Sequence, residues 1–130
     1  MNISEAAAAS GVSAKMIRHY EAIGLVPKPR RSGANYRVYS DADVHTLRFV
    51  RAARALGFSM PEIGELLDLW RDRRRPSRKV KALVTAHMRE LEVRIAELQA
   101  MKTSLEHLAQ HCHGDERPDC PILERLEGAP

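Results

Sequence analysis

The two cysteines of this chain share one short segment near the end of the sequence. Cys112 and Cys120 both lie in HCHGDERPDC, residues 111–120, whose Gly, Asp and Pro residues are typical of a loop. Two thiols on one loop can ligate a metal ion or act as a redox switch. Two thiolates suffice to hold a soft monovalent cation in near-linear geometry, whereas zinc generally takes four N, S or O ligands. The pair therefore favours a cation such as Cu(I) or Ag(I).

Two histidines flank Cys112 and keep other interpretations open. His111 and His113 could join both cysteines in a four-ligand zinc site, although adjacent side chains point apart and converge poorly on one tetrahedral ion. A thiol redox sensor is a further alternative, while a structural disulfide is disfavoured in a reducing compartment. A zinc-responsive protein and a redox sensor thus remain alternatives to a Cu(I) sensor.

Nothing in the sequence predicts a membrane span, a leader peptide or a catalytic centre. No apolar run reaches the roughly 18 residues of a span, and the N-terminus lacks a basic-then-apolar signal pattern. We therefore expect a cytoplasmic protein without a membrane partner. There is no nucleophile with a partnered base, and the thiols lie beside no phosphate-binding loop, so we do not expect an enzyme.

Charge is distributed unevenly along the chain. Residues 1–81 hold 16 Lys and Arg against 8 Asp and Glu, whereas residues 82–130 hold 5 against 9. A basic first part and an acidic second part indicate an anionic partner, such as nucleic acid, for the first part alone. A different class of function is the alternative: a cytosolic copper carrier, in which the basic half of the chain would serve only to keep the protein in solution.

The first seventy residues carry the start and stop signals of a winged helix-turn-helix. Asn2 with Glu5 predicts a capped helix that Gly11 ends, and Ser13 then caps a second helix that runs to Gly24. Residues 25–40 contain Pro, Gly and Asn followed by strand-forming residues, and predict a β-ribbon or wing. Two more helices follow, one capped by Ser40 and one by the capping box Ser59 to Glu62.

A long helix without Gly or Pro is predicted from residue 77 to 111, after the basic connector 71–76. Steps of four and three from Ser77 reach Cys112, and seven of the nine positions between them are apolar. This 3.5-residue period predicts a coiled coil, and therefore a homodimer, although a helix folded back on residues 1–70 is an alternative. The seam positions between Ser77 and Cys112 are Lys81, Val84, Met88, Leu91, Ile95, Leu98, Lys102, Leu105 and Ala109.

The expected architecture is mainly α. It comprises a winged helix-turn-helix DNA-binding domain (1–70), the connector (71–76), a dimerisation helix (77–111) and a metal-binding loop with a short helix (112–130). Ser77 and Cys112 are five heptads apart on the same seam. In an antiparallel coiled coil, Ser77 of the partner subunit would therefore lie beside the metal loop without adding a thiolate.

Three motifs together resemble the MerR family of transcription regulators: IRHYEAIGLV (17–26), NYRVYS (35–40) and LRFVRAARALGFSMPEI (47–63). The resemblance runs over nearly the whole chain and implies a winged helix-turn-helix that binds a palindromic promoter duplex as a homodimer. Lys15 and Arg18, three residues apart, share one face of the expected recognition helix. The DNA contacts that the resemblance implies are Lys15, Arg18, Tyr20, Arg31, Tyr36, Arg37 and Arg54.

The segment CHGDERPDCPI, residues 112–122, together with Ser77, resembles the copper-efflux regulators of the CueR type within that family. Divalent sensors of the family usually carry Cys at the position of Ser77. The resemblance implies that Cys112 and Cys120 hold one Cu(I) per protomer, with Ag(I) and Au(I) as further candidates. It also implies that the metal-bound dimer distorts promoter DNA so that RNA polymerase can transcribe copper-efflux genes.

Overall fold

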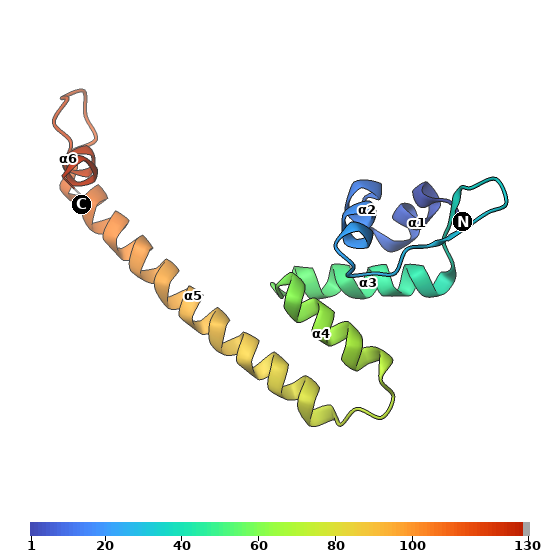
Figure 1. Ribbon diagram of the computed structural model, residues 1–130. Coiled ribbons are helices and arrows are strands. Elements are labelled where there is room, and N and C mark those ends of the chain that lie inside the picture. Colours follow the sequence, from blue (N-terminus) through green and yellow to red (C-terminus); the bar gives the residue numbers. More distant parts are fainter. Residues whose placement is uncertain (129–130) are drawn as a thin grey trace. The chain divides into compact units, whose positions relative to one another are not determined.

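The computed structural model describes residues 1–128 and is mainly helical, as the sequence predicts (Figure 1). The elements, in chain order, are α1 (Ile3–Ser10), α2 (Ala14–Ala22), β1 (Arg30–Arg31), β2 (Arg37–Val38), α3 (Asp41–Ala55), α4 (Met60–Arg71), α5 (Ser77–His111) and α6 (Pro121–Glu127). Two compact units are present, Met1–Val84 and the part of the chain from Thr85 onward. The sequence-based division of the chain after residues 70, 76 and 111 assigns each segment a functional role, and it stays a prediction.

The helices of the first unit begin at the residues whose side chains cap them. Asn2, Ser40 and Ser59 each form a complete capping box with the acidic residue three positions later. Ser13 accepts a hydrogen bond from the Met16 backbone N–H and so caps α2. Because these caps satisfy backbone donors locally, the helix starts could be predicted from sequence alone.

The core of the first unit is formed by apolar side chains from several helices. Its most deeply buried large side chains are Ile17, Tyr20, Val50, Ile63 and Leu67. Helix α1 packs against α2 and α3, and α3 packs against α4. Val80 and Leu83, in the first turns of α5, also pack against this core. The hydrophobic effect of burying these side chains holds the helix-turn-helix in place.

The predicted wing is a small antiparallel hairpin in which Arg31 of β1 pairs with Arg37 of β2. Asn35 has a φ of 66°, a left-handed conformation that Asn tolerates better than most residues. Beyond the hairpin, the backbones of Met1 and Tyr39 exchange two hydrogen bonds of 2.7 and 2.9 Å. The base of the hairpin is thereby tied to the start of the chain.

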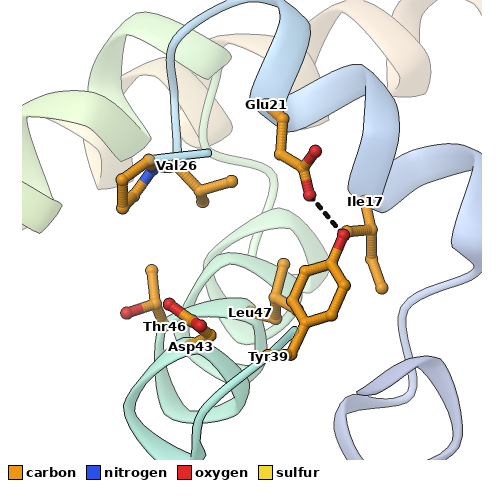
Figure 2. Close-up of a pocket in the computed structure, with 8 residues that line it drawn as sticks. Ile17, Glu21, Val26, Tyr39, Asp43, Thr46 and Leu47 are labelled. Carbon is orange, nitrogen blue, oxygen red and sulfur yellow. Dashed lines mark hydrogen bonds between the residues drawn. The ribbon is translucent and has the colours of Figure 1, made fainter. Parts of the chain in front are cut away.

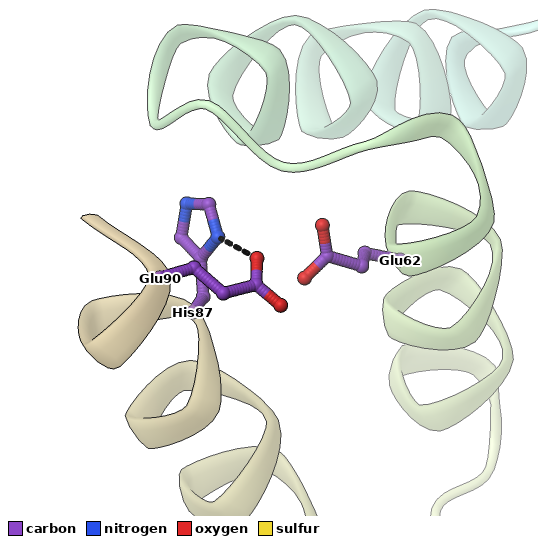
Figure 3. Close-up of side chains that lie close together, drawn as sticks. All are labelled: Glu62, His87 and Glu90. Carbon is purple, nitrogen blue, oxygen red and sulfur yellow. Dashed lines mark ion pairs between the residues drawn. The ribbon is translucent and has the colours of Figure 1, made fainter. Parts of the chain in front are cut away.

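The second unit contains most of α5, the loop after it and α6. Among residues 1–128, every buried apolar residue lies at or before Leu67. The seam side chains of α5 are exposed: Met88 by 54%, Ile95 by 65% and Leu98 by 63%. Within α5, the Nδ1 atom of the buried His87 lies 3.7 Å from the carboxylate of Glu90, one turn further along (Figure 3). No helix in the described part of the chain is both long and apolar enough to span a membrane.

Candidate nucleic-acid interface and metal loop

Helix α2 presents two basic side chains to solvent. Lys15 and Arg18 are both exposed and lie one turn apart, as expected for the recognition helix of a helix-turn-helix. Ile17 points from the same helix into the core and is fully buried. The alternation of buried and exposed positions fixes which face of α2 is available for a major groove.

A groove beside the start of α2 is lined by two further guanidinium groups. Arg51 and Arg54 of α3 line it, together with Gly11, Ser13 and other residues of the turn. Gly11 has a φ of 77°, and a Cβ at this position would lie 2.7 Å from Arg51 Nη1. The backbone conformation therefore favours glycine, and a larger residue here would also have to displace the end of the Arg51 side chain.

The position of Tyr20 differs from the expectation that it reaches a phosphate. Its side chain is 2% exposed and belongs to the core, and its hydroxyl accepts a hydrogen bond of 2.7 Å from Arg54 Nη1. A buried ring on the inner face of α2 cannot extend toward DNA. We therefore correct its role from direct contact to holding Arg54, which is itself exposed.

The hairpin carries the other predicted contacts. Tyr36, at the tip, is 74% exposed, and Arg31 is exposed with one guanidinium N–H donating to the Asn35 carbonyl at 3.1 Å. Arg37 is half-buried, with 29% of its side chain exposed. Its guanidinium faces the buried carboxylate of Glu21.

Glu21 forms a buried polar cluster with Tyr39 and Arg37. The Tyr39 hydroxyl donates to Glu21 Oε1 at 2.6 Å (Figure 2). Arg37 Nη1 lies 3.1 Å from Glu21 Oε2. Burial, followed by the contact with the Glu21 carboxylate, raises the pKa of Tyr39 to about 12. Figure 2 shows Glu21 and Tyr39 beside Asp43, Thr46 and Leu47 of α3.

Three side chains that position the interface were not among the predicted contacts. Glu21 and Arg51 have been described above, and Arg48 donates two hydrogen bonds, of 2.8 and 3.0 Å, to the Ala9 carbonyl near the end of α1. The sequence signal for Arg48 and Arg51 was their spacing with Arg54 along one side of α3. For Glu21 there was none, because an acidic residue at the end of a helix usually faces solvent.

The two cysteines lie at the two ends of the loop between α5 and α6. Cys112 follows the last residue of α5, and Cys120 occupies the N-cap position of α6. Their sulfurs are 3.7 Å apart, and both thiols are free and half-buried. The distance far exceeds a disulfide bond of about 2.05 Å. The fold thus brings the two thiols close together.

Local hydrogen bonds shape this loop and tune one of its thiols. Asp115 accepts hydrogen bonds from the Arg117 backbone at 2.9 Å and from its guanidinium at 2.8 Å, which holds the pKa of Asp115 below its usual value. The backbone N–H of Leu123 lowers the pKa of Cys120, and the Cys112 thiol adds to this effect against partial desolvation. A lowered pKa favours the thiolate, which is the form that ligates metal.

The sulfur separation sets a geometric condition for a bound ion. With metal–sulfur bonds of about 2.3 Å, the length found for zinc thiolates, a tetrahedral angle needs sulfurs about 3.8 Å apart and a linear arrangement about 4.6 Å. From the observed 3.7 Å, the sulfurs must separate by roughly 1 Å to accommodate a linear ion. The hydrogen bonds of this loop given above join residues close in sequence, so two half-buried thiols on it can make this adjustment.

The histidines beside Cys112 do not complete a ligand set. His111 Nδ1 lies 2.7 Å from the His107 carbonyl, so the ring is turned back along α5. In the described residues of this chain, Cys112 and Cys120 belong to no group of three or more His, Cys, Asp or Glu ligand atoms within 4.8 Å of one another. The pair as it stands offers two sulfur donors.

Comparison with known proteins places this fold in a family. Residues 1–70 match the family described as MerR HTH family regulatory protein, and residues 44–108 match the one described as MerR, DNA binding. The chain is 60% identical over 126 residues to heavy metal-dependent transcription regulator 2 of Rhizobium meliloti (strain 1021), covering 97% of this chain and 86% of that protein. It is 44% identical over 128 residues to the HTH-type transcriptional regulator CueR of Salmonella typhimurium (strain LT2), covering 98% and 93% of the two chains.

A solved structure has the same fold over almost the whole length. The transcription regulator PbrR691 from Ralstonia metallidurans CH34, in complex with lead(II), matches with a TM-score of 0.84 at 32% identity, covering 97% of this chain and 98% of that one. The family match over the first 70 residues and the 60% and 44% identities along nearly the whole chain agree with this likeness. This protein therefore belongs to the MerR family of transcription regulators.

Proposed function

We propose that this protein is a homodimeric activator of transcription that responds to Cu(I), with one ion per protomer bound by Cys112 and Cys120. The observation that carries the proposal is the thiol pair, whose sulfurs lie 3.7 Å apart and belong to no larger ligand group in the described chain. A soft monovalent ion accepts two thiolates as a complete ligand set, and Ag(I) and Au(I) share this chemistry. The similarity to CueR and to a heavy metal-dependent regulator supports a metal-sensing role.

The sulfur geometry suggests how metal binding in the loop could change the conformation of the rest of the protein. A linear ion requires the two sulfurs to separate by roughly 1 Å, and Cys120 is followed directly by Pro121, the first residue of α6. Opening the pair therefore displaces the start of α6. In this proposal the loop is the moving part, and α6 carries the displacement to the rest of the dimer.

The proposed DNA interface lies entirely within the first unit. Lys15 and Arg18 enter the major groove on α2, and the basic side chains of the hairpin and of α3 contact phosphates. Tyr20 acts through Arg54, whose guanidinium it holds. The side chains proposed to contact DNA are Lys15, Arg18, Arg31, Tyr36, Arg37 and Arg54, with Arg51 added from the structure.

The exposed seam of α5 supports the homodimer. Met88, Ile95 and Leu98 are all more than half exposed in the single chain, and burying such a stripe against a second copy is favourable. Helix α5 has 35 residues, a length of about 52 Å. If two copies run antiparallel, Ser77 of the partner subunit lies beside Cys112, where its hydroxyl adds no thiolate charge.

The dimer would act on a palindromic promoter in the cytoplasm and remain bound with and without metal. Metal binding changes the angle between the two DNA-binding units and distorts the duplex, so that RNA polymerase can engage both promoter elements. The metal needs only to bind the activating conformation more tightly. A difference of about 5.5 kcal/mol converts a 1:99 population into 99:1. The regulated genes would be those of copper efflux.

Zinc is the second candidate, because one observation favours it. The separation of 3.7 Å already matches two thiolates on a tetrahedral zinc ion. The other two ligands would have to be supplied by His113, by a turned His111 or by the partner. A thiol redox switch would instead need the sulfurs to close to about 2.05 Å.

The proposal can be tested by transcription from a promoter duplex carrying the palindrome. With purified protein and RNA polymerase, Cu(I) should raise transcript yield while promoter occupancy stays constant, and Zn(II) should not. Cys120→Ser should occupy the promoter normally and give no response. A copper carrier would show no preference for the palindrome over a scrambled duplex, and activation by Zn(II) alone would move the assignment to a divalent sensor.

A further inference from the structure

The cluster of Glu21, Tyr39 and Arg37 joins the recognition helix to the hairpin. Glu21 lies in the last turn of α2 and is 5% exposed, which is rare for a carboxylate. Arg37 belongs to β2, and Tyr39 follows that strand directly. Figure 2 shows the Glu21 carboxylate directed at the Tyr39 hydroxyl. Removing a carboxylate from water is costly unless it is paired, so these two partners are required for its burial.

The contact with Arg37 is an ion pair that leaves the guanidinium usable. Arg37 Nη1 is 3.1 Å from Glu21 Oε2, but the two atoms are not aligned as a hydrogen bond. A guanidinium has five N–H donors in a rigid fork, and 29% of this side chain is exposed. Glu21 can therefore hold Arg37 from the inside while its outer N–H groups remain available to a phosphate.

Glu21 is also a counter-ion in a strongly basic hairpin. Arg30, Arg31 and Arg37 occupy three of the four strand positions, and Arg31 is directly opposite Arg37. Like charges placed opposite each other on two strands repel. Asp43, which lines the same pocket, is committed to the Ser40 capping box. Glu21 is thus the carboxylate that contacts the guanidinium of β2.

We propose that Glu21 is a positioning residue for sequence-specific DNA binding, which fixes the hairpin relative to α2 by holding Arg37 and Tyr39. This inference rests on the proposed DNA contact of Arg37. A carboxylate close to DNA repels phosphates, so it lowers affinity for any duplex. The presence of Glu21 is explained if it restricts Arg37 to one position. That position would favour the distance between α2 and the hairpin that fits the promoter.

The proposal makes opposite predictions for specific and non-specific binding. Glu21→Gln keeps the side-chain size and an oxygen for the Tyr39 hydroxyl but removes the charge that holds Arg37. Affinity for a scrambled duplex should stay equal or rise, because a repulsive charge is gone. Affinity for the palindromic promoter should fall, so that the ratio of the two decreases on the order of tenfold. A residue that only stabilises the fold would lower both affinities together.

A double-mutant cycle with Arg37→Ala identifies the route. Fluorescence anisotropy would be measured for both duplexes at several salt concentrations, on full-length protein with melting curves recorded in parallel. If Glu21 acts through Arg37, Glu21→Gln should change the affinity ratio by less than about twofold in the Arg37→Ala background. The same tenfold loss in that background, or equal losses on both duplexes, would overturn the proposal.

Two further variants keep the test decisive. Arg37→Ala alone should weaken binding to both duplexes and reduce the salt dependence of binding by about one phosphate contact. Unchanged binding would contradict the DNA contact of Arg37, which is part of the proposed function. That result is distinguishable from a failure of the role proposed for Glu21. If Glu21→Gln does not fold, Tyr39→Phe keeps the charge and releases one side of the carboxylate. It should lower the affinity ratio by a smaller factor, and an unchanged ratio would contradict the positioning role.

Discussion

The two compact units of this protein differ in where their apolar side chains lie. In Met1–Val84, residues from α1 to α4 bury a shared core, and several polar side chains at its edge are held by caps, hydrogen bonds or an ion pair. In the described part of the second unit, no apolar residue is buried, and the loop 112–120 is held by its own short-range contacts. This difference agrees with the proposed function, in which the first unit packs around its own core and the second is completed by a second copy and a bound ion.

The largest expected effect is on the exposed seam. Leu98→Glu places a charge in the coiled coil of both copies, so the dimer should dissociate at micromolar concentration. Promoter affinity should then fall at least about 100-fold, because binding through two linked units is lost. Sedimentation and fluorescence anisotropy would measure these changes. The first unit should remain folded by circular dichroism.

Gln99→Glu is the matched control, since it adds the same charge to the neighbouring position off the seam. It should leave both the dimer and promoter binding intact. A Leu98→Glu protein that stays dimeric would contradict the assignment of the seam and with it the dependence of the second unit on a partner.

The next effect is on the core of the first unit. Leu67 is 1% exposed, so Leu67→Ala should lower the free energy of unfolding by about 2–5 kcal/mol. Leu123→Ala, at a position 65% exposed in α6, should change it by less than about 0.5 kcal/mol. Chemical denaturation would compare the two, and Cu(I) affinity of the folded Leu67→Ala protein should be unchanged. Equal losses of stability in the two variants would contradict the conclusion that buried apolar side chains stabilise the first unit more than the second.

The helix starts of the first unit could be predicted from sequence because their causes are local. Asn2, Ser13, Ser40 and Ser59 each cap the helix that the pattern assigned to them, and the left-handed conformation of Asn35 falls at the expected bend. The approach of Cys112 to Cys120 was likewise predictable from a short loop between two helices.

Packing between elements could not be predicted in the same way. Tyr20 was expected to contact DNA, but its side chain belongs to the core, and its hydroxyl accepts a hydrogen bond from Arg54. Glu21 carries a charge that would normally face water, and only the fold brings Arg37 and Tyr39 to it. Trp70, near the end of α4, is 39% exposed, and its ring stacks on that of Phe49 with the ring centroids 4.6 Å apart.

A smaller effect should appear in strong alkali. The pKa of Tyr39 is raised to about 12 in the folded protein, against 10.0 for an unperturbed tyrosine. The folded state thus holds this proton more tightly, so the associated stability is fully present below pH 10 and is lost as the pH rises toward 12. The loss should reach at most about 2 kcal/mol.

Denaturation at pH 9 and pH 11.5 would measure this dependence in the wild type and two variants. Tyr39→Phe should lose the part of the dependence due to this hydroxyl, whereas Tyr36→Phe, at a hydroxyl on a ring 74% exposed, should keep it. If the pH dependence of stability is unchanged in Tyr39→Phe, the buried cluster of the first unit is not its cause.

The smallest effect concerns the cap of the recognition helix. Ser13→Ala removes the acceptor of the Met16 N–H and should cost about 1 kcal/mol of unfolding free energy. Ser104→Ala, in the middle of α5, removes a serine that caps nothing and should cost less than about 0.5 kcal/mol. Thermal melts of the two variants would separate them, and a reversed order would contradict the local origin of the α2 start.

The central claim, a two-thiolate sensor of a monovalent ion, is tested most directly by titrating the reduced protein anaerobically with Cu(I) against a competing chelator. The same titration would be run with Zn(II), and both would be repeated on Cys112→Ser. We predict one tightly bound Cu(I) per protomer, lost in Cys112→Ser, with zinc at least about 100-fold weaker, equivalent to roughly 2.7 kcal/mol. Tight zinc together with weak Cu(I) would contradict the claim and assign the loop to a divalent sensor.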